Sequence, residues 1–254
     1  MWRTLINFGN RLNAMKSFAF VCFLISIFLI SSCEESETIP EINRGSVTDS
    51  DGNVYSTVKI GGQWWMTSNL RVTTFRKGES IPQLVDSIEW LSGGPGFSIH
   101  PDATTEMGLL YNWNAVSDSR GIAPEGWHVA TDEDWQRLEK QMGMETSAAE
   151  KFGWRGSGEG DALKATGTNN WVRFDPVWAT NAAGFNALAG SCRIQDGRYG
   201  SPGTQYTGFW WTRTPSAVDP DKAFFRYLDY KRSQVFRQVE ARGFGFSVRC
   251  VKDQ

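Results

Sequence analysis

Hydrophobic and polar residues alternate with a period of two along several short stretches of the chain, the first of them between residues 47 and 66. There the segment VTDSDGNVYSTVKIGGQWWM places strand-forming residues on both sides of two turn signals, Asp51-Gly52-Asn53 and Gly61-Gly62. An alternating stretch interrupted by tight turns is typical of antiparallel strands that follow one another. We therefore predict a β-meander with strands at 47–48, 55–60 and 63–66.

A different period marks the segment TDEDWQRLEKQMG, where Trp135, Leu138 and Met142 fall on one face at helical spacing. Thr131 is a favourable N-cap, and the three acidic residues after it occupy the first turn, where the helix dipole favours anions. Gly143 is a natural stop. The pattern predicts a helix over about 132–142. The acids beside His128 thus have a structural explanation, and we expect that histidine to be structural as well.

The remaining stretches predict few helices and a β-rich C-terminal half. Residues 78–110 are loop-like with a short helical turn around 86–91, and residues 144–184 carry only weak helical signals. No linker or repeat interrupts the chain from 47 to 254, so we predict a single domain there. Short strands are expected at 185–188, 190–194, 208–213, 223–228, 234–237 and 245–251.

The N-terminal segment has the pattern of a secretory signal. Residues 18–30 are apolar or small and follow Arg3, Arg11 and Lys16. The apolar run is shorter than the roughly 20 residues that a membrane span needs, so an uncleaved signal anchor is the less favoured alternative. Met1 and Met15 both remain candidates for the start of translation. The string Leu-Ile-Ser-Ser-Cys33 resembles a bacterial lipobox. That resemblance implies a signal peptide of residues 1–32 and a lipid-modified Cys33 that anchors the chain to a membrane.

The charge of the chain outside this signal is negative. Removing the three basic residues of positions 1–32 leaves 23 Lys and Arg against 28 Asp and Glu, a net charge of about −5. Nucleic-acid binding needs clustered positive charge, so we expect no nucleic-acid partner. Residues 33–46 form an acidic tether. The acids directly after Cys33 resemble the signal that sends Bacteroidetes lipoproteins to the outer face of the outer membrane, with the periplasmic face as the alternative.

Seven strings follow one another along the chain and cover nearly all of residues 47–252: VTDSDGNVYSTVKIGGQWWMTSNLR, YNWNAV, GWHVATDEDW, LKATG, ATNAAGFNALAG, GFWWTRTPS and GFSVRCV. In this order they resemble the Fibrobacter succinogenes major paralogous domain. The family in turn is similar, more distantly, to the C-type lectin-like fold. The resemblance therefore implies an α+β domain of twisted antiparallel strands, one or two helices and long irregular loops.

Two of the four cysteines, Cys192 and Cys250, belong to the predicted domain. In an oxidising compartment such a pair can form a disulfide, and we take their pairing as a hypothesis. The family commonly has a cysteine at the position of Ala123, where this chain has none. That departure leaves open whether Cys192 and Cys250 pair.

Twelve tryptophans are many for a chain of this length, so we expect an aromatic core, an aromatic binding surface, or both. Those set in patterned strands or the helix are expected in the core: Trp64, Trp65, Trp113, Trp127, Trp135, Trp210 and Trp211. Loop aromatics beside planar polar side chains suit sugar rings, with burial in the core as the alternative. These ligand-binding candidates are Trp154, Trp171, Trp178 and Tyr199.

A second candidate surface is a basic-aromatic hairpin that contains Arg226, Tyr230 and Arg237, with Lys231 and Arg232 between them. Arginine and tyrosine often dominate protein interfaces, so this hairpin is a candidate docking face. The alternative is an ordinary solvated strand surface.

We expect a non-catalytic binding protein without cofactor or metal. The chain lacks the His/Cys cluster of a zinc site and the two closely spaced cysteines of a formylglycine-generating oxidase. No carboxylate pair stands out as a glycosidase site, which makes a glycan-active enzyme the less favoured alternative. The expected ligand is a glycan or a surface protein. An envelope structural or assembly role is the other alternative. Sugar binding, if present, should not need calcium, because the calcium-binding strings of lectins do not occur.

Overall fold

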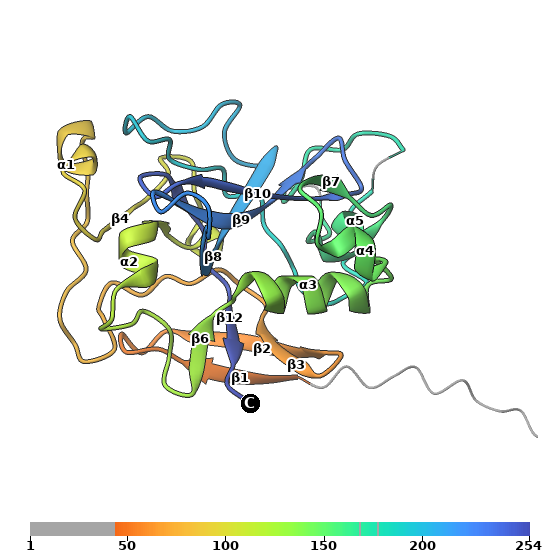
Figure 1. Cartoon of the computed structure of the whole chain (residues 1–254), viewed down its shortest axis with the longest axis horizontal. Helices are drawn as coiled ribbons and strands as arrows, with labels where there is room; N and C mark the ends of the chain where they lie inside the picture. Colours follow the sequence, from red (N-terminus) through yellow and green to blue (C-terminus); the bar gives the residue numbers. More distant parts are fainter. Residues whose placement is uncertain (1–43, 168, 177) are drawn as a thin grey trace, which may run out of the picture. The chain divides into compact units, whose positions relative to one another are not determined.

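The first β-sheet joins the two ends of the domain, as Figure 1 shows at the bottom of the view. A computed structural model of the chain describes residues 44–167, 169–176 and 178–254. In this sheet the C-terminal strand lies between β3 and β6, and all neighbouring pairs are antiparallel. The strand order is β1 (Arg44–Thr48), β2 (Val54–Ile60), β3 (Gln63–Met66), β12 (Cys250–Lys252) and β6 (Trp127–Val129).

The predicted meander of residues 47–66 is confirmed, although its first strand begins at Arg44 rather than at Val47. Ser46 pairs with Ser56 and Gly45 with Thr57, so the hydrogen-bonded ladder continues through residues without an alternating pattern. Backbone pairing does not require hydrophobic side chains, and for that reason the pattern did not reveal this extension.

A second antiparallel sheet of four strands follows in the C-terminal half, and three of its strands, β8, β9 and β10, have seven or more residues, while a small third sheet lies beside it. The second sheet has the order β7 (Gly153–Arg155), β10 (Val235–Ala241), β9 (Lys222–Asp229) and β8 (Thr207–Pro215). The third has the order β11 (Gly245–Phe246), β5 (Leu110–Asn112) and β4 (Phe97–Ser98).

The helices of the described residues are short, and α3 (Asp132–Gln141) is the longest with ten residues. Its predicted N-cap is confirmed, because the Thr131 hydroxyl accepts a hydrogen bond from the Asp134 amide at 3.1 Å. The chain is therefore an α+β protein dominated by antiparallel sheets. The other helices are α1 (Ser87–Leu91), α2 (Trp113–Ser117), α4 (Thr146–Ala149), α5 (Glu159–Leu163) and the 3-10 turn η1 (Thr105–Met107).

Two predicted strands, 185–188 and 190–194, are not formed. This stretch makes only isolated bridges, such as the one between Ser191 and Gly208. Asn186 has a φ of 58° and Ser191 a φ of 60°, and this left-handed backbone cannot continue an extended strand. The prediction was wrong because an apolar stretch with small residues also suits a buried loop.

A large hydrophobic core cluster lies where α3 runs between the two larger sheets (Figure 1). Trp135 of α3 packs against Trp65 of the first sheet and Trp210 of the second, with ring centroids 5.4 and 6.1 Å apart. Edge-to-face and tilted contacts of this kind are the favoured geometries of aromatic pairs. Of the tryptophans predicted in the core, all are buried except Trp64, which is partly buried.

The predicted signal peptide, Cys33 and most of the predicted tether lie outside the described residues. Among residues 44–167, 169–176 and 178–254, no helix has the length and apolar composition that crossing a bilayer requires.

Candidate functional site

A pocket of about 410 Å³ lies where the segment after α5 meets the turn after β9. It brings together three of the predicted ligand-binding residues, Trp171, Trp178 and Tyr230. Its volume falls within the roughly 300–1,000 Å³ of small-molecule sites. The lining residues are Lys164, Thr166, Gly167, Trp171, Val172, Arg173, Trp178, Ala179 and Tyr230.

Trp171 forms a fixed part of the pocket wall. Only 6% of this residue is exposed, and its indole Nε1–H donates to the Ala187 carbonyl at 2.9 Å. It also packs with the core cluster that contains Trp135. Trp171 therefore touches the pocket from within the core, which was the alternative expected for the loop aromatics, and its N–H finds a buried acceptor that the sequence did not reveal.

Trp178, in contrast, is 49% exposed. The Arg173 guanidinium lies over its ring, 4.2 Å from the centroid, which is a cation–π contact. The Trp178 amide donates to the Asp161 carboxylate at 3.4 Å. An exposed tryptophan held at both its ring and its backbone presents a large flat surface at little further cost in conformational entropy.

Tyr230 forms another part of the wall within an aromatic group. Its ring meets Tyr206 and Phe174 edge to face, with centroids 5.2 and 5.8 Å apart, and Phe174 is 41% exposed. The Lys231 ammonium lies 5.1 Å from the centre of the Tyr230 ring. Aromatic surface and cations therefore lie together around the pocket.

Lys164 supplies a buried ammonium group. Its side chain is 1% exposed, and Nζ donates to the Asp161 carboxylate at 3.0 Å and to the Arg232 carbonyl at 2.6 Å. Burial lowers the pKa of Lys164, although the charge of Asp161 opposes that shift. Lys164 was not among the candidate residues predicted from the sequence. The available signal was the string LKATG, which contributes Lys164, Thr166 and Gly167 to the pocket.

Trp154 and Tyr199, the other two loop candidates, lie away from this pocket. Trp154 is a partly buried residue of β7 that packs against Tyr227 and Phe236, with ring centroids 5.2 and 5.1 Å away. The Tyr199 hydroxyl donates to the Ile99 carbonyl at 2.7 Å, and its ring meets His100. Neither residue joins the other candidates in one site.

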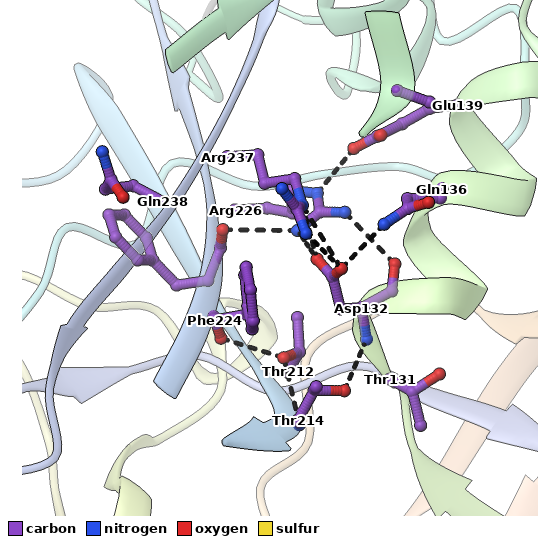
Figure 2. A network of polar contacts seen from close by, with 12 residues as sticks. Thr131, Asp132, Gln136, Glu139, Thr212, Thr214, Phe224, Arg226, Arg237 and Gln238 are labelled. Carbon is purple, nitrogen blue, oxygen red and sulfur yellow. Dashed lines mark hydrogen bonds and ion pairs between the residues drawn. The ribbon is translucent and has the colours of Figure 1, made fainter. Parts of the chain in front are cut away.

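Arg226 and Arg237 do not form an exposed docking face, and this part of the prediction is corrected. They are 0% and 7% exposed and point toward α3, where both meet Asp132 (Figure 2). Alternation along β9 and β10 places them on the face of the sheet that α3 covers. Tyr230 lies beyond the end of β9, so the hairpin divides between the core and the pocket.

The buried charges form a connected network. Arg226 donates to Asp132 at 2.7 Å and to Glu139 at 2.6 Å, and Arg155 donates to Glu139 at 2.7 Å. Burial alone would raise the pKa of Asp132, but its contacts with Arg237 and Arg226 outweigh burial and lower that pKa to about 2. The network holds α3 to the second sheet and has no exposed reactive group.

Cys192 and Cys250 are both free and buried, so the hypothesised disulfide is absent from the structure. Burial raises the pKa of the Cys192 thiol to about 12, and it also raises the pKa of Cys250. A thiol that stays protonated is a poor nucleophile. Both cysteines therefore act as core residues.

His128 lies between two carboxylates. Its Nε2 is 2.9 Å from Asp134 and its Nδ1 is 2.7 Å from Asp253. The hydrogen bond with Asp134 raises the pKa of His128 most, burial opposes that shift, and Asp253 adds to it. The structural role expected for His128 thus takes the form of a link between the start of α3 and the C-terminus. Within the part of the chain that the structure describes, no group of three or more His, Cys, Asp and Glu could hold a metal ion.

Comparison with known proteins gives a match to one family. The model of the Fibrobacter succinogenes major domain matches residues 58–252, which include α3, the pocket, the second sheet and the first sheet except for β1 and the start of β2. The searches of curated proteins and of solved structures return no match. Because the match spans most of the chain, this protein belongs to the Fibrobacter succinogenes major domain family.

Proposed function

We propose that this protein is a non-catalytic binding module that recognises a glycan through the pocket of Trp171, Trp178 and Tyr230. The observation that carries the proposal is the half-exposed Trp178 at a pocket whose polar groups include Arg173 and Lys164. Sugar rings offer an apolar face and a rim of hydroxyls, and an aromatic wall with a few polar groups matches both. The contacts of His128 with Asp134 and Asp253 and the burial of Cys192 and Cys250 support a non-catalytic role.

The proposal includes the anchoring and the location of the protein. The apolar segment 18–30 and the lipobox-like string that ends at Cys33 support export and lipidation. Acids directly after Cys33 support an outward-facing position in the outer membrane. A binding module tethered there would act in adhesion or in glycan capture. If the Cys33→Ala variant remains bound to the membrane after its signal peptide has been removed, the lipid anchor is contradicted.

A C-type lectin-like arrangement is the proposed finer description of the fold. The antiparallel sheets, the few helices and the long loops that carry the pocket support it. We expect a crystal structure of the protein to superpose on C-type lectin-like domains. In both, the N- and C-terminal strands should lie in one sheet. A different strand order would contradict it.

The test of the binding function is a glycan array probed with the full chain in detergent, with and without a chelator. We expect selective binding that the chelator leaves unchanged and that Trp178→Ala removes. Trp171→Ala is unsuitable because removing a buried aromatic ring costs about 3–5 kcal/mol of stability. A blank array from a folded chain would contradict the glycan assignment.

Docking of a partner protein in the envelope is the second candidate, and the surface of α1 favours it. Val85, Ile88 and Leu91 are 67%, 82% and 60% exposed. Beneath them, the buried Arg193 donates to the carbonyls of residues 84–86 and holds this turn in place. Two results together would favour this function. The glycan array stays blank, and a partner protein that crosslinks specifically to the wild type no longer crosslinks to the Ile88→Asp variant.

A further inference from the structure

The charges that line the pocket are all positive. Lys164 and Arg173 are the ionisable cations of the lining, and no Asp or Glu belongs to it among the described residues. The whole sequence, in contrast, has a net charge of −2. Within the described part of the chain, the pocket wall thus carries cations and no carboxylates, although the protein as a whole is acidic. By charge complementarity, such a wall favours a negatively charged ligand.

Lys164 and Arg173 each keep N–H donors that their aspartate partners do not use. Asp161 binds Lys164 through one oxygen and the Trp178 amide through the other, and the Arg232 carbonyl takes a second hydrogen of the ammonium. An ammonium has three donors, so one remains. Arg173 uses Nε for Asp175 at 3.2 Å, and its side chain is 68% exposed. A guanidinium has five donors, and its two terminal nitrogens suit an anion that binds through two oxygens.

We propose, on the basis of the glycan function above, that the pocket takes an acidic sugar, a ring bearing one carboxylate or sulfate group. The sugar ring packs against Trp178 and Tyr230, and Arg173 binds the anionic group with Lys164 as the second cation. The volume of the pocket lies toward the lower end of the range for ligand sites, which fits a terminal ring better than the middle of a long chain.

Isothermal titration of the full chain in detergent with three probes tests this inference. The probes are glucose, glucuronate and glucose 6-sulfate, which share the ring and differ in the anionic group. We expect at least one of the two acidic sugars to bind about tenfold or more tightly than glucose, because a hydrogen bond to a charged group is stronger than a neutral one. The comparison of glucuronate with the sulfate tells which anion is preferred.

Two variants assign the preference to Arg173. Arg173→Gln should abolish most of the preference for the acidic sugar, so that the ratio of the affinities for the acidic sugar and for glucose falls toward one. Arg198→Gln is the matched control, because Arg198 also forms an exposed pair with an aspartate two positions away, and its side chain is 76% exposed outside the pocket. It should behave like the wild type.

The outcomes separate this inference from the proposed function. Equal affinity for glucose and both acids, or a preference that survives Arg173→Gln, would overturn the acidic-sugar inference while binding itself stands. If none of the three probes binds and a glycan array is also blank, the glycan function fails together with the inference.

Discussion

Arg226 shows how much structure a single buried side chain can carry. It is 0% exposed and bridges Asp132 and Glu139 at opposite ends of α3. Such a network stabilises little relative to a hydrophobic core, yet it is costly to break. Without Arg226, Asp132 would keep Arg237 and Glu139 would keep Arg155, but both carboxylates would lose a buried charged hydrogen-bond donor. The basic residues that resemble a binding face in the sequence are therefore fixed inside the protein.

Replacing this side chain should be strongly destabilising. We expect Arg226→Ala to lower the free energy of unfolding by about 3–5 kcal/mol, since Asp132 and Glu139 lose a shared cation in the core. Urea denaturation of Arg226→Ala and of the exposed control Arg198→Ala measures the difference. The control should change stability by less than about 0.5 kcal/mol. Equal stabilities of the two variants would contradict the buried network.

His128 should make stability depend on pH. Its folded pKa is raised, so its stabilising contribution is complete below the unfolded pKa of about 6.5 and is lost as pH rises through the folded pKa. The pKa of Asp134 is lowered, and its contribution is lost at the acidic end instead, as pH falls through its folded value.

The measurement compares the unfolding free energy of the wild type and His128→Asn across pH 5.5 to 9. We expect the difference between the two proteins to shrink as pH rises above about 6.5. If the difference in unfolding free energy stays constant over this pH range, Asp134 and Asp253 do not stabilise a protonated His128 imidazole.

The elements of the fold differ in how far their own sequence defines them. α3 could be predicted because its cap, its acidic first turn and its apolar face all lie within one local stretch. The inward direction of the Arg226 side chain could not be predicted, because it depends on which face of β9 is covered by α3. The pocket combines Trp171, Trp178 and Tyr230, whose segments were predicted only as loop and turn. Its aromatic residues could be named from the sequence, but their assembly depends on long-range packing.

The close packing of α5 against β10 gives a testable prediction. A Cβ at Gly160 would lie 2.4 Å from the carbonyl oxygen of Gln234, so α5 sits directly against the backbone at the start of β10. We expect Gly160→Ala to destabilise the protein by about 1–3 kcal/mol through overpacking, although alanine favours helices.

Gly158→Ala is the matched control, because a Cβ at this position meets nothing within 4 Å. Thermal unfolding of both variants, followed by circular dichroism, measures the effect. If Gly160→Ala melts at the same temperature as Gly158→Ala, the close contact between α5 and the strand is absent.

At the scale of the whole molecule, packing and buried charge hold the domain together without a crosslink between Cys192 and Cys250. We expect both thiols to be alkylated when the protein is unfolded without reductant, and neither to react in the folded state, because both are buried. Mass spectrometry of the alkylated protein measures this. A bridged Cys192–Cys250 peptide in the unreduced protein would contradict the free thiols.

Ligand binding at the pocket built around Trp178 is the main prediction for the whole molecule. The most direct test is the dissociation constant of the strongest glycan found on the array, measured for Trp178→Ala and for Phe152→Ala. Phe152 is a suitable control because it is 53% exposed and lies outside the pocket. We predict a loss of about tenfold or more for Trp178→Ala, equivalent to about 1.4 kcal/mol, and nearly unchanged affinity for Phe152→Ala. Equal affinity of the two variants for the glycan would contradict the assignment of the site.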